Sequence, residues 1–293
     1  MTLMLWHKGF IMAKISDYSL YLVISEEASR GMPAERIAEL AVSSGVDIIQ
    51  MREKNKSREH LLSLGKKIHK ICKNRNVPFI VNDDPLLAKD IDADGVHMGQ
   101  GDLRNFSIEE IRRIIGKDKI VGVSTHSLDQ FNAAVASCAD YIAFGPVFKT
   151  PAKDYFLGTK DISAVLKNAK KPVFFIGGVT LDNLDKLLEL GVKNIALIRD
   201  IILAEDIPGR VASYKEKINN YKKGSGFINV RVNGKNESVL SQIDLRGFVL
   251  SKGLQCERIV LELNSRIVPK QEWQGIKLSE SDTLEIISFV GGG

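Results

Sequence analysis

Charged side chains follow several short apolar runs in the larger, N-terminal part of the chain. The segment "QMREK" carries Arg52 and Lys54, and "FGPVFKTPAK" ends on Lys153. Two other runs are followed by a carboxylate, Asp83 after "PFIVN" and Asp102 in "GVHMGQGD". Three cations could hold a polyanion, and two carboxylates with open coordination positions suit a magnesium ion that also binds substrate phosphates. Together these residue types indicate a diphosphate site.

Such a site needs a scaffold that brings the ends of distant segments together. Short apolar runs alternate with segments whose apolar residues recur every three or four positions, as on one face of a helix. The runs are "SLYLVIS", "DIIQMRE", "PFIVND", "GVHMG", "IVGVST", "YIAFGPVF", "PVFFIGG" and "NIALIRD". Strands of low polarity that are each followed by a helix predict a parallel sheet covered by helices. Eight such units in a row predict an α/β protein with a closed (β/α)8 TIM barrel.

An open, doubly wound sheet is the alternative arrangement of the same elements. If it bound a dinucleotide, it would need a glycine-rich turn after its first strand. The chain has "EEASRGM" after "LYLVIS", without such a turn. The barrel is therefore favoured, and in a barrel the working residues project from the carboxyl ends of the strands. This expectation places the cations and both carboxylates on one rim, the end of the barrel where the strands finish.

A different pattern begins after the polar, glycine-rich segment "YKKGSG" at 221–226, which predicts a linker between two domains. The segment "FINVRVNGKNESVL" reads as two alternating strands around Asn233 and Gly234, a strong hairpin signal. The segment "LRGFVLSKG" predicts a short helix, and "RIVLELN" and "DTLEIISFV" predict two more strands. This ββαββ order predicts a small α+β domain of the β-grasp, ubiquitin-like type. We expect the barrel at 13–220 and the β-grasp domain at 227–293.

Composition narrows the class of protein. With 44% apolar and 26% charged residues, the chain is typical of a folded globular protein. The net charge of +5 lies before Gly226, because the remainder carries eight basic and eight acidic residues. No basic stripe is interleaved with aromatic residues, so we expect no nucleic-acid partner. No apolar run is long enough for a membrane span, and the opening "MTLMLWHKGFIM", with candidate starts at Met1 and Met12, is too broken for a secretory signal.

The three cysteines, Cys72, Cys138 and Cys256, are far apart and show no C-x-x-C pairing. Each falls in an otherwise apolar or helical pattern, which predicts buried thiols in place of metal ligands or disulfides. Reduced thiols fit a cytoplasmic location.

Six motifs occur in one order: "QMREK", "ND", "GVHMGQGD", "GVSTHS", "FGPVFKTPAK" and "IGGV". Together they resemble thiamine phosphate synthase from Tyr18 to about Ile218. In that family a pyrimidine diphosphate loses pyrophosphate, and its methylene carbon is captured by the ring nitrogen of a thiazole phosphate. A metal ion and fixed cations fit this chemistry, because negative charge builds on oxygen atoms as pyrophosphate departs. No side-chain nucleophile is needed, since the pyrimidine cation only has to be held near the thiazole nitrogen with water excluded.

The resemblance also implies a role for each matching residue. It implies Mg²⁺ as cofactor, held by Asp83 and Asp102. The residues implied for the pyrimidine diphosphate are Gln50, Met51, Arg52, Glu53, Lys54, Asn82, Ser124 and Lys153. Of these, the ones implied as catalytic are Arg52, Lys54, Ser124 and Lys153. The positions implied for the thiazole phosphate are Thr150, Pro151, Ala152, Gly178, Ile198 and Arg199.

Three positions depart from the family pattern. Ala152 stands where the family usually has a second threonine, and Arg199 where it usually has a serine. We interpret this pair as compensatory, because the planar guanidinium of Arg199 can replace hydroxyl donors at a phosphate. Asp84 stands where the family tends to have arginine, and nothing in the sequence explains that change.

The segments "INVRVNGK", "LNSRIVPKQEW" and "DTLEIISFVGGG" resemble the small sulfur carrier of the thiamine pathway, over Gly226 to Gly293. In that family an activating enzyme adenylates the terminal glycine, which becomes a thiocarboxylate that supplies sulfur to thiazole synthase. The resemblance implies these two enzymes as partners and Gly292 and Gly293 as the functional terminus. A frayed end is the alternative, since glycine adds no packing, but a tail without side chains can thread into a narrow active site.

Three rival functions stay open for the barrel, and an oligomer is compatible with each. A thiazole tautomerase would share the fold but would not handle a diphosphate, which the charged rim disfavours. An inactive barrel could serve only as a handle for the sulfur carrier. A Schiff-base aldolase using Lys54 or Lys153 ranks last, because neither lysine lies in an apolar setting that would favour a neutral amine.

Overall fold

The computed structural model describes residues 15, 18–151, 153–224, 227–241, 243–252, 254 and 256–288. The chain divides into two compact units, and the division falls between Ile218 and Asn219. None of the helices in the described part is both long and apolar enough to cross a membrane.

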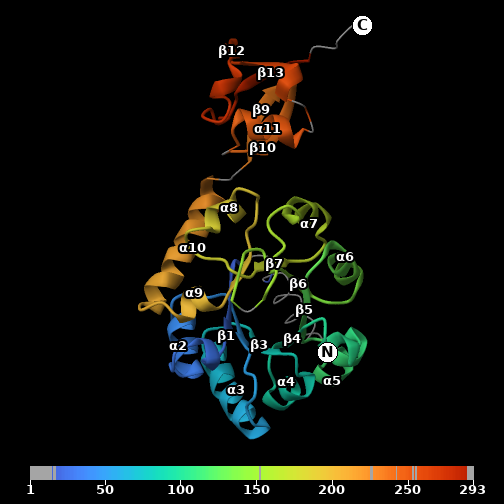
Figure 1. Ribbon diagram of the computed structural model, residues 1–293, viewed down its shortest axis with the longest axis vertical. Helices are drawn as coiled ribbons and strands as arrows, with labels where there is room; N and C mark the ends of the chain where they lie inside the picture. Colours follow the sequence, from blue (N-terminus) through green and yellow to red (C-terminus); the bar gives the residue numbers. More distant parts are fainter. Residues whose placement is uncertain are drawn as a thin grey trace. The chain divides into compact units, whose positions relative to one another are not determined.

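The first unit is a closed barrel in which eight strands pair in chain order, from β1 to β8. Figure 1 shows these strands inside a ring of helices. The strands are β1 (Leu20–Ile24), β2 (Ile48–Met51), β3 (Phe79–Asn82), β4 (Gly95–Met98), β5 (Ile120–Thr125), β6 (Tyr141–Phe144), β7 (Val173–Ile176) and β8 (Ile195–Leu197). Each lies within one of the predicted apolar runs, and parallel pairing of β1 with β8 closes the barrel. The predicted TIM barrel is confirmed.

Helices follow the strands along the chain. They are α2 (Ala34–Ser43), α3 (Arg58–Lys73), α4 (Pro85–Ile91), α5 (Ile108–Ile115), α6 (Leu128–Ala136), α7 (Ile162–Asn168), α8 (Leu184–Leu188), α9 (Arg199–Ile202) and α10 (Ile207–Gly224). Helix α3 begins with an N-cap, since the Ser57 hydroxyl accepts a hydrogen bond from the backbone of His60. Ser107 and Glu110 form a capping box at the start of α5. These caps pair backbone N–H groups that have no partner inside the helix.

Asp84 has a structural role at the start of α4. Its carboxylate accepts a hydrogen bond of 2.7 Å from the backbone nitrogen of Leu87 and forms an ion pair of 3.1 Å with Arg58. The aspartate is therefore an N-cap, which accounts for its presence beside Asp83.

Aromatic rings fill the inside of the barrel. Tyr21, Tyr141 and Phe174 pack edge to face, with ring centroids 5.3 to 5.8 Å apart. Gly122 of β5 leaves room for the ring of Tyr141, because a Cβ at this position would lie 2.0 Å from it. The interior is thus a packed core in which two tyrosine hydroxyls need polar partners.

The second unit is a single sheet with strand order β10-β9-β13-β11-β12. Its elements are β9 (Phe227–Val232), β10 (Lys235–Leu240), α11 (Leu245–Ser251), β11 (Ile259–Leu263), β12 (Arg266–Val268) and β13 (Thr283–Ser288). Strand β13 runs parallel to β9 and antiparallel to β11, as in a β-grasp fold. The core gathers around Phe248, Leu261 and Trp273. The φ angles of Asn233 and Gly234 are +47° and +76°, as a two-residue hairpin turn requires, so the predicted hairpin is confirmed.

Two secondary-structure elements differ from the predicted pattern. Strand β12 was not predicted, so the order is ββαβββ, because its three residues before Pro269 are too few to show an alternating pattern. Helix α10 continues through Tyr221–Gly224, the first part of the segment expected to be a linker. Tyrosine and lysine do not break a helix, and the glycine comes only at its end.

The prediction that all three cysteines are buried is wrong for Cys138. Helix α6 ends at Ala136, so Cys138 lies beyond the apolar face of the helix and is exposed. Cys72 is buried and Cys256 is partly buried, and all three thiols are free.

Candidate active site

The predicted site residues that the structure describes lie at the carboxyl ends of the barrel strands. Gln50 and Met51 finish β2 and are buried, at 3% and 2% exposure. Asn82 finishes β3 beside His97 of β4, and Ser124 lies next to the last residue of β5. Because all eight strands are parallel, these ends belong to one rim.

The loops that follow the barrel strands carry three cations. In the part of the chain that the structure describes, Arg52, Lys54 and Lys153 form no ion pair with a carboxylate. Arg52 is partly buried and the two lysines are exposed. The ammonium of Lys153 lies 5.8 Å from the ring centroid of Tyr155, within reach of a cation–π contact. These three cations are available to bind an anion.

The carboxylates of Asp83 and Asp102 both lie beside Gly99. The backbone nitrogen of Gly99 donates a hydrogen bond of 2.8 Å to Oδ1 of Asp83. A Cβ at Gly99 would lie 3.0 Å from Oδ2 of Asp102 and 3.4 Å from Oδ1 of Asp83. Burial raises the pKa of Asp83, and the adjacent Asp102 carboxylate raises it further. The glycine therefore avoids a tight contact beside two carboxylates that repel each other.

The backbone of Asp83 holds its carboxylate in place. Its φ angle is +61°, in the left-handed region that few residues other than glycine adopt. Its backbone nitrogen donates to the carbonyl oxygen of His97 at 2.8 Å, and the Asn82 amide donates to Oδ2 of its side chain. Strain of this kind clusters at functional sites.

These two carboxylates fit a magnesium ion. The described residues include no group of three or more His, Cys, Asp and Glu side chains that could enclose a metal ion. Magnesium is commonly held by one or two carboxylates together with waters and substrate phosphates. The repulsion that a cation would relieve favours this donor set.

A chain of polar side chains crosses the barrel interior. Nε2 of Gln50 donates to the Tyr21 hydroxyl at 2.6 Å, and that hydroxyl lies 2.8 Å from the hydroxyl of Tyr141. The Tyr141 hydroxyl lies 2.9 Å from Nδ1 of His97, and Nε2 of His97 lies 2.8 Å from Oγ of Ser124. Burial lowers the pKa of His97 to about 3, so the ring is neutral near pH 7.

The two tyrosines of this hydrogen-bond chain, Tyr21 and Tyr141, were not among the predicted site residues. Burial raises the pKa of both Tyr21 and Tyr141, so they remain hydroxyl donors. The one signal available in the sequence was a hydroxyl group within each of two otherwise apolar strands.

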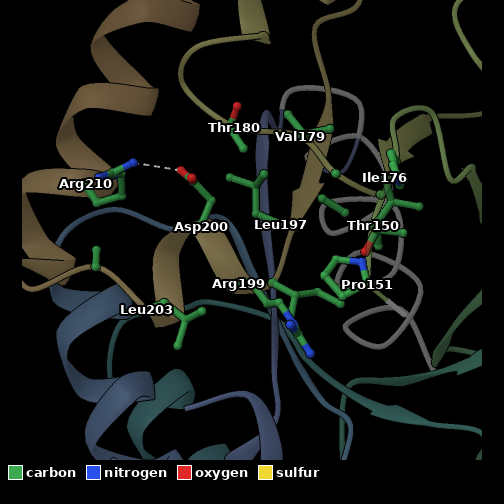
Figure 2. Close-up of a pocket in the computed structure, with 16 residues that line it drawn as sticks. Thr150, Pro151, Ile176, Val179, Thr180, Leu197, Arg199, Asp200, Leu203 and Arg210 are labelled. Atoms are coloured by element: carbon green, nitrogen blue, oxygen red, sulfur yellow. Dashed lines mark hydrogen bonds and ion pairs between the residues drawn. The ribbon is translucent and has the colours of Figure 1, made fainter. Parts of the chain in front are cut away.

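A cavity of about 390 Å³ lies at the ends of β7 and β8, and Figure 2 shows its lining. Its lining residues include Thr150, Pro151, Gly178, Ile198 and Arg199, which are the described members of the predicted thiazole phosphate site. Ala152, the remaining member, lies outside the described residues. The cavity therefore brings together residues from three separate strand ends.

Positive charge prevails in this cavity. Asp200 accepts hydrogen bonds of 3.0 Å from Arg210 and 2.6 Å from the Tyr214 hydroxyl. Figure 2 shows Asp200 turned toward Arg210, with the side chain of Arg199 extending away from that pair. Arg199 and the lining residue Lys149 form no ion pair among the described residues. Sequence reasoning missed Arg210 and Lys149, and no motif links α10 to this strand end.

A turn of two glycines lines this cavity and packs closely against the segment that contains Lys149. The φ angles of Gly177 and Gly178 are +97° and +67°. A Cβ at Gly178 would lie 2.4 Å from the carbonyl oxygen of Lys149. Only glycine satisfies both the backbone angle and the close approach.

A second cavity, of about 580 Å³, lies beside the ends of β1 and β2. It is lined by Glu26, Glu53 and Lys54, among others. The Glu53 carboxylate accepts a hydrogen bond of 2.7 Å from the backbone nitrogen of Glu26, and burial raises its pKa. Glu53 thus joins two rim loops, whereas Lys54 is exposed at the cavity.

Comparisons with known proteins match both units. Residues 20–201 match the family described as thiamine monophosphate synthase, and residues 230–293 match the ThiS family. A thiamine-phosphate synthase of Halalkalibacterium halodurans is 36% identical over 196 residues, which is 66% of this chain and 92% of that protein. The enzyme of that name from Persephonella marina is 36% identical over 207 residues, 70% of this chain and 98% of that protein. A solved thiamine phosphate pyrophosphorylase from Pyrococcus furiosus is 29% identical with a TM-score of 0.64, covering 71% of this chain and 98% of that one.

Proposed function

Because the chain belongs to the thiamine monophosphate synthase family, with a ThiS-family domain after the barrel, we propose a two-part role in thiamine biosynthesis. The barrel joins a hydroxymethylpyrimidine diphosphate to a thiazole phosphate and gives thiamine phosphate and pyrophosphate. The bond between the methylene carbon and the pyrophosphate oxygen breaks, and its electron pair leaves with pyrophosphate. The thiazole nitrogen then supplies the electron pair of the new carbon–nitrogen bond.

One observation carries the proposal: three cations that form no ion pair among the described residues, and a carboxylate pair beside Gly99, follow parallel strands whose carboxyl ends share one rim. Arg52, Lys54 and Lys153 hold the diphosphate and stabilise the negative charge that grows as it departs. A magnesium ion held by Asp83 and Asp102 would neutralise charge on the departing oxygens.

The polar residues at the ends of β2, β3 and β5 orient the pyrimidine end of the substrate. Gln50, Asn82 and Ser124 offer amide and hydroxyl groups at the rim, and Met51 offers an apolar surface beside them. Glu53 binds the backbone of Glu26, so its contribution to the substrate is to fix the rim loop. Holding the two reactants in line is the main task of such a site.

The cavity at β7 and β8 takes the thiazole phosphate. Thr150 and the glycine turn at Gly178 offer hydrogen-bond donors, and Arg199 offers a planar guanidinium without an acidic partner among the described residues. Arg199 replaces the hydroxyl donors that are absent at Ala152 and at its own position, because a guanidinium binds phosphate through two parallel hydrogen bonds.

The second domain acts as a sulfur carrier. The ThiS-family match and the β-grasp sheet support this role. Gly292 and Gly293, which lie outside the described residues, provide the terminal carboxylate. An activating enzyme adenylates it, it becomes a thiocarboxylate, and thiazole synthase receives the sulfur.

The barrel activity is tested by incubating the full chain with Mg²⁺ and both substrates and identifying the products by mass spectrometry. We expect thiamine phosphate and pyrophosphate in equal amounts, and neither when one substrate or the metal ion is omitted. Isomerisation of a thiazole without pyrophosphate release would instead identify a tautomerase. No conversion of any substrate would identify a barrel that serves only as a handle for the carrier.

A further inference from the structure

Each hydrogen bond of the polar chain inside the barrel has a donor and an acceptor, and these can be assigned in order from Gln50. The amide nitrogen of Gln50 faces the oxygen of Tyr21 at 2.6 Å, and an amide nitrogen can only donate. Either of the two hydroxyls could donate in the 2.8 Å contact between Tyr21 and Tyr141, but donation by Tyr21 gives its buried hydrogen an acceptor, and leaving that hydrogen unpaired would be costly. Tyr141 in turn directs its hydrogen to Nδ1 of His97 at 2.9 Å.

The direction continues through His97 to the rim. In a neutral imidazole one nitrogen accepts and the other carries the proton. Because Nδ1 accepts from Tyr141, the proton lies on Nε2, which donates to Oγ of Ser124 at 2.8 Å. The hydrogen of the Ser124 hydroxyl is then not used within the chain. This hydrogen is available as a donor at the half-buried rim end of the chain.

A charged imidazole would not fit this chain. With a proton on each nitrogen, His97 would donate to Tyr141, and one tyrosine hydrogen would be left inside the barrel without an acceptor in the chain. Leaving a buried donor unpaired is costly.

We propose that Gln50, Tyr21, Tyr141 and His97 form a directed hydrogen-bond chain that holds Ser124 as a hydrogen-bond donor toward the bound pyrimidine diphosphate. In this role Tyr21, Tyr141 and His97 are positioning residues, because they act through Ser124. The identity of the ligand rests on the proposed function, whereas the direction of the chain is a property of the protein without substrate.

Packing fixes the rings that carry this chain. The ring of Tyr141 occupies the space that Gly122 leaves free, since a Cβ there would lie 2.0 Å away. The same ring stacks on His97 with a centroid distance of 5.5 Å and meets Tyr21 edge to face at 5.8 Å. The side-chain amide of Gln100 donates to the carbonyl oxygen of Ser124 at 2.6 Å and so anchors the end of β5.

A fixed direction has a chemical consequence at Ser124. If the chain ran the other way, the Ser124 hydroxyl would donate to His97 and could offer only lone pairs to the substrate. Lone pairs would repel the oxygens of a diphosphate, on which negative charge grows during the reaction. In the proposed direction the hydroxyl donates to the substrate, and its loss should lower kcat roughly ten- to hundredfold, as for a hydrogen bond to a charged group.

The direction is tested on the free, full-length chain labelled with ¹⁵N-histidine. The ¹⁵N chemical shifts of a neutral imidazole show which nitrogen carries the proton, and the signals of His97 are those missing from the His97→Gln variant. We expect the proton on Nε2. A proton on Nδ1, or a charged ring near pH 7, would overturn the proposal, and the result does not depend on whether the chain is a transferase.

The action through Ser124 is tested with a double-mutant cycle. We expect Tyr141→Phe to lower kcat roughly tenfold or more, with little change in the KM for the thiazole phosphate. In the Ser124→Ala background the same tyrosine change should have almost no further effect, because the interaction it supports is already absent. Independent, multiplicative effects, or a Tyr141→Phe enzyme with unchanged kcat, would overturn the positioning role. A wild-type chain without transferase activity would contradict the proposed function, and the histidine measurement would still decide the direction.

Discussion

Asp83 and Asp102 each place a carboxylate oxygen beside the position that a Cβ of Gly99 would occupy, at 3.4 and 3.0 Å. Burial raises the pKa of Asp83, and the second carboxylate adds to that shift. A divalent cation held by both carboxylates would relieve this repulsion. The pair is therefore the part of the rim where a small change in shape should alter metal binding most clearly.

Gly99→Ala should weaken the magnesium site without removing a ligand. The added methyl group would displace the Asp102 carboxylate. We therefore expect the Mg²⁺ concentration for half-maximal turnover to rise roughly tenfold or more, as when a group that orients a metal ligand is changed. Gly101→Ala is the matched control, because a Cβ at Gly101 meets nothing within 4 Å. Equal magnesium dependence of the two variants would show that the metal does not bind between these carboxylates.

Arg199→Ala should raise the KM for the thiazole phosphate roughly ten- to hundredfold, the value of a hydrogen bond to a charged group. The KM for the pyrimidine diphosphate should change little, because Arg199 lines the cavity at β7 and β8. Arg36→Ala is a suitable control, since Arg36 is exposed and paired with Glu39 of the same helix. An unchanged KM in Arg199→Ala, together with loss of turnover in Lys153→Ala, would contradict the compensation for Ala152.

Gly178→Ala should lower the free energy of unfolding by more than the unfavourable backbone angle alone explains. A Cβ at Gly178 would lie 2.4 Å from the Lys149 carbonyl oxygen, and the φ angle is +67°. Gly158→Ala introduces a Cβ at a similar φ of +73° with nothing within 4 Å. We expect the free energy of unfolding to fall by about 1 to 3 kcal/mol more in Gly178→Ala than in Gly158→Ala, from the added overpacking. Equal losses in urea denaturation would place the whole effect in the backbone angle.

His97 should make the barrel less stable as the pH falls. The folded ring has a pKa of about 3, whereas the unfolded ring keeps its ordinary value of 6.5, so between these values only the unfolded state takes up the proton. The free energy of unfolding therefore decreases as the pH falls through this window, by on the order of 2 kcal/mol at about pH 5. His97→Gln lacks this contribution, and urea denaturation of both proteins near pH 7 and pH 5 measures it. Identical pH dependence of the two would show that the buried ring is not held neutral.

The barrel could be predicted because its signals are local. Short apolar runs marked all eight barrel strands. The short strand β12 and the last turn of α10 were missed, because three residues carry no period and lysines are neutral toward helix continuation.

The charged part of the site could also be anticipated, since residue type and position at a strand end are both visible in the sequence. Contacts across the barrel could not. The hydroxyls of Tyr21 and Tyr141 meet from strands β1 and β6, which are far apart in the chain. The ion pair of Asp200 and Arg210 likewise depends on how α10 returns to the end of β8. Such pairings depend on tertiary structure and leave no local pattern.

The terminal glycines of the second domain should react with an activating enzyme. Incubation with ATP, a sulfur source and that enzyme should shift the intact mass of the full chain by the replacement of one oxygen with sulfur. A chain that lacks Gly293 should show no shift, because the carboxylate is then misplaced in the partner's narrow site. An unshifted mass for the intact chain would argue against a sulfur carrier.

The central claim, that the rim holds a diphosphate through magnesium, is tested most directly by calorimetric titration of the full chain with pyrophosphate. We expect binding at one site that needs Mg²⁺, is lost in Asp102→Asn and is weakened in Lys153→Ala. Asp118→Asn should bind as the unchanged chain does, because Asp118 is exposed and precedes β5 at the opposite end of the barrel. Absence of binding with Mg²⁺, or binding that is equally strong without the metal and in Asp102→Asn, would contradict the account.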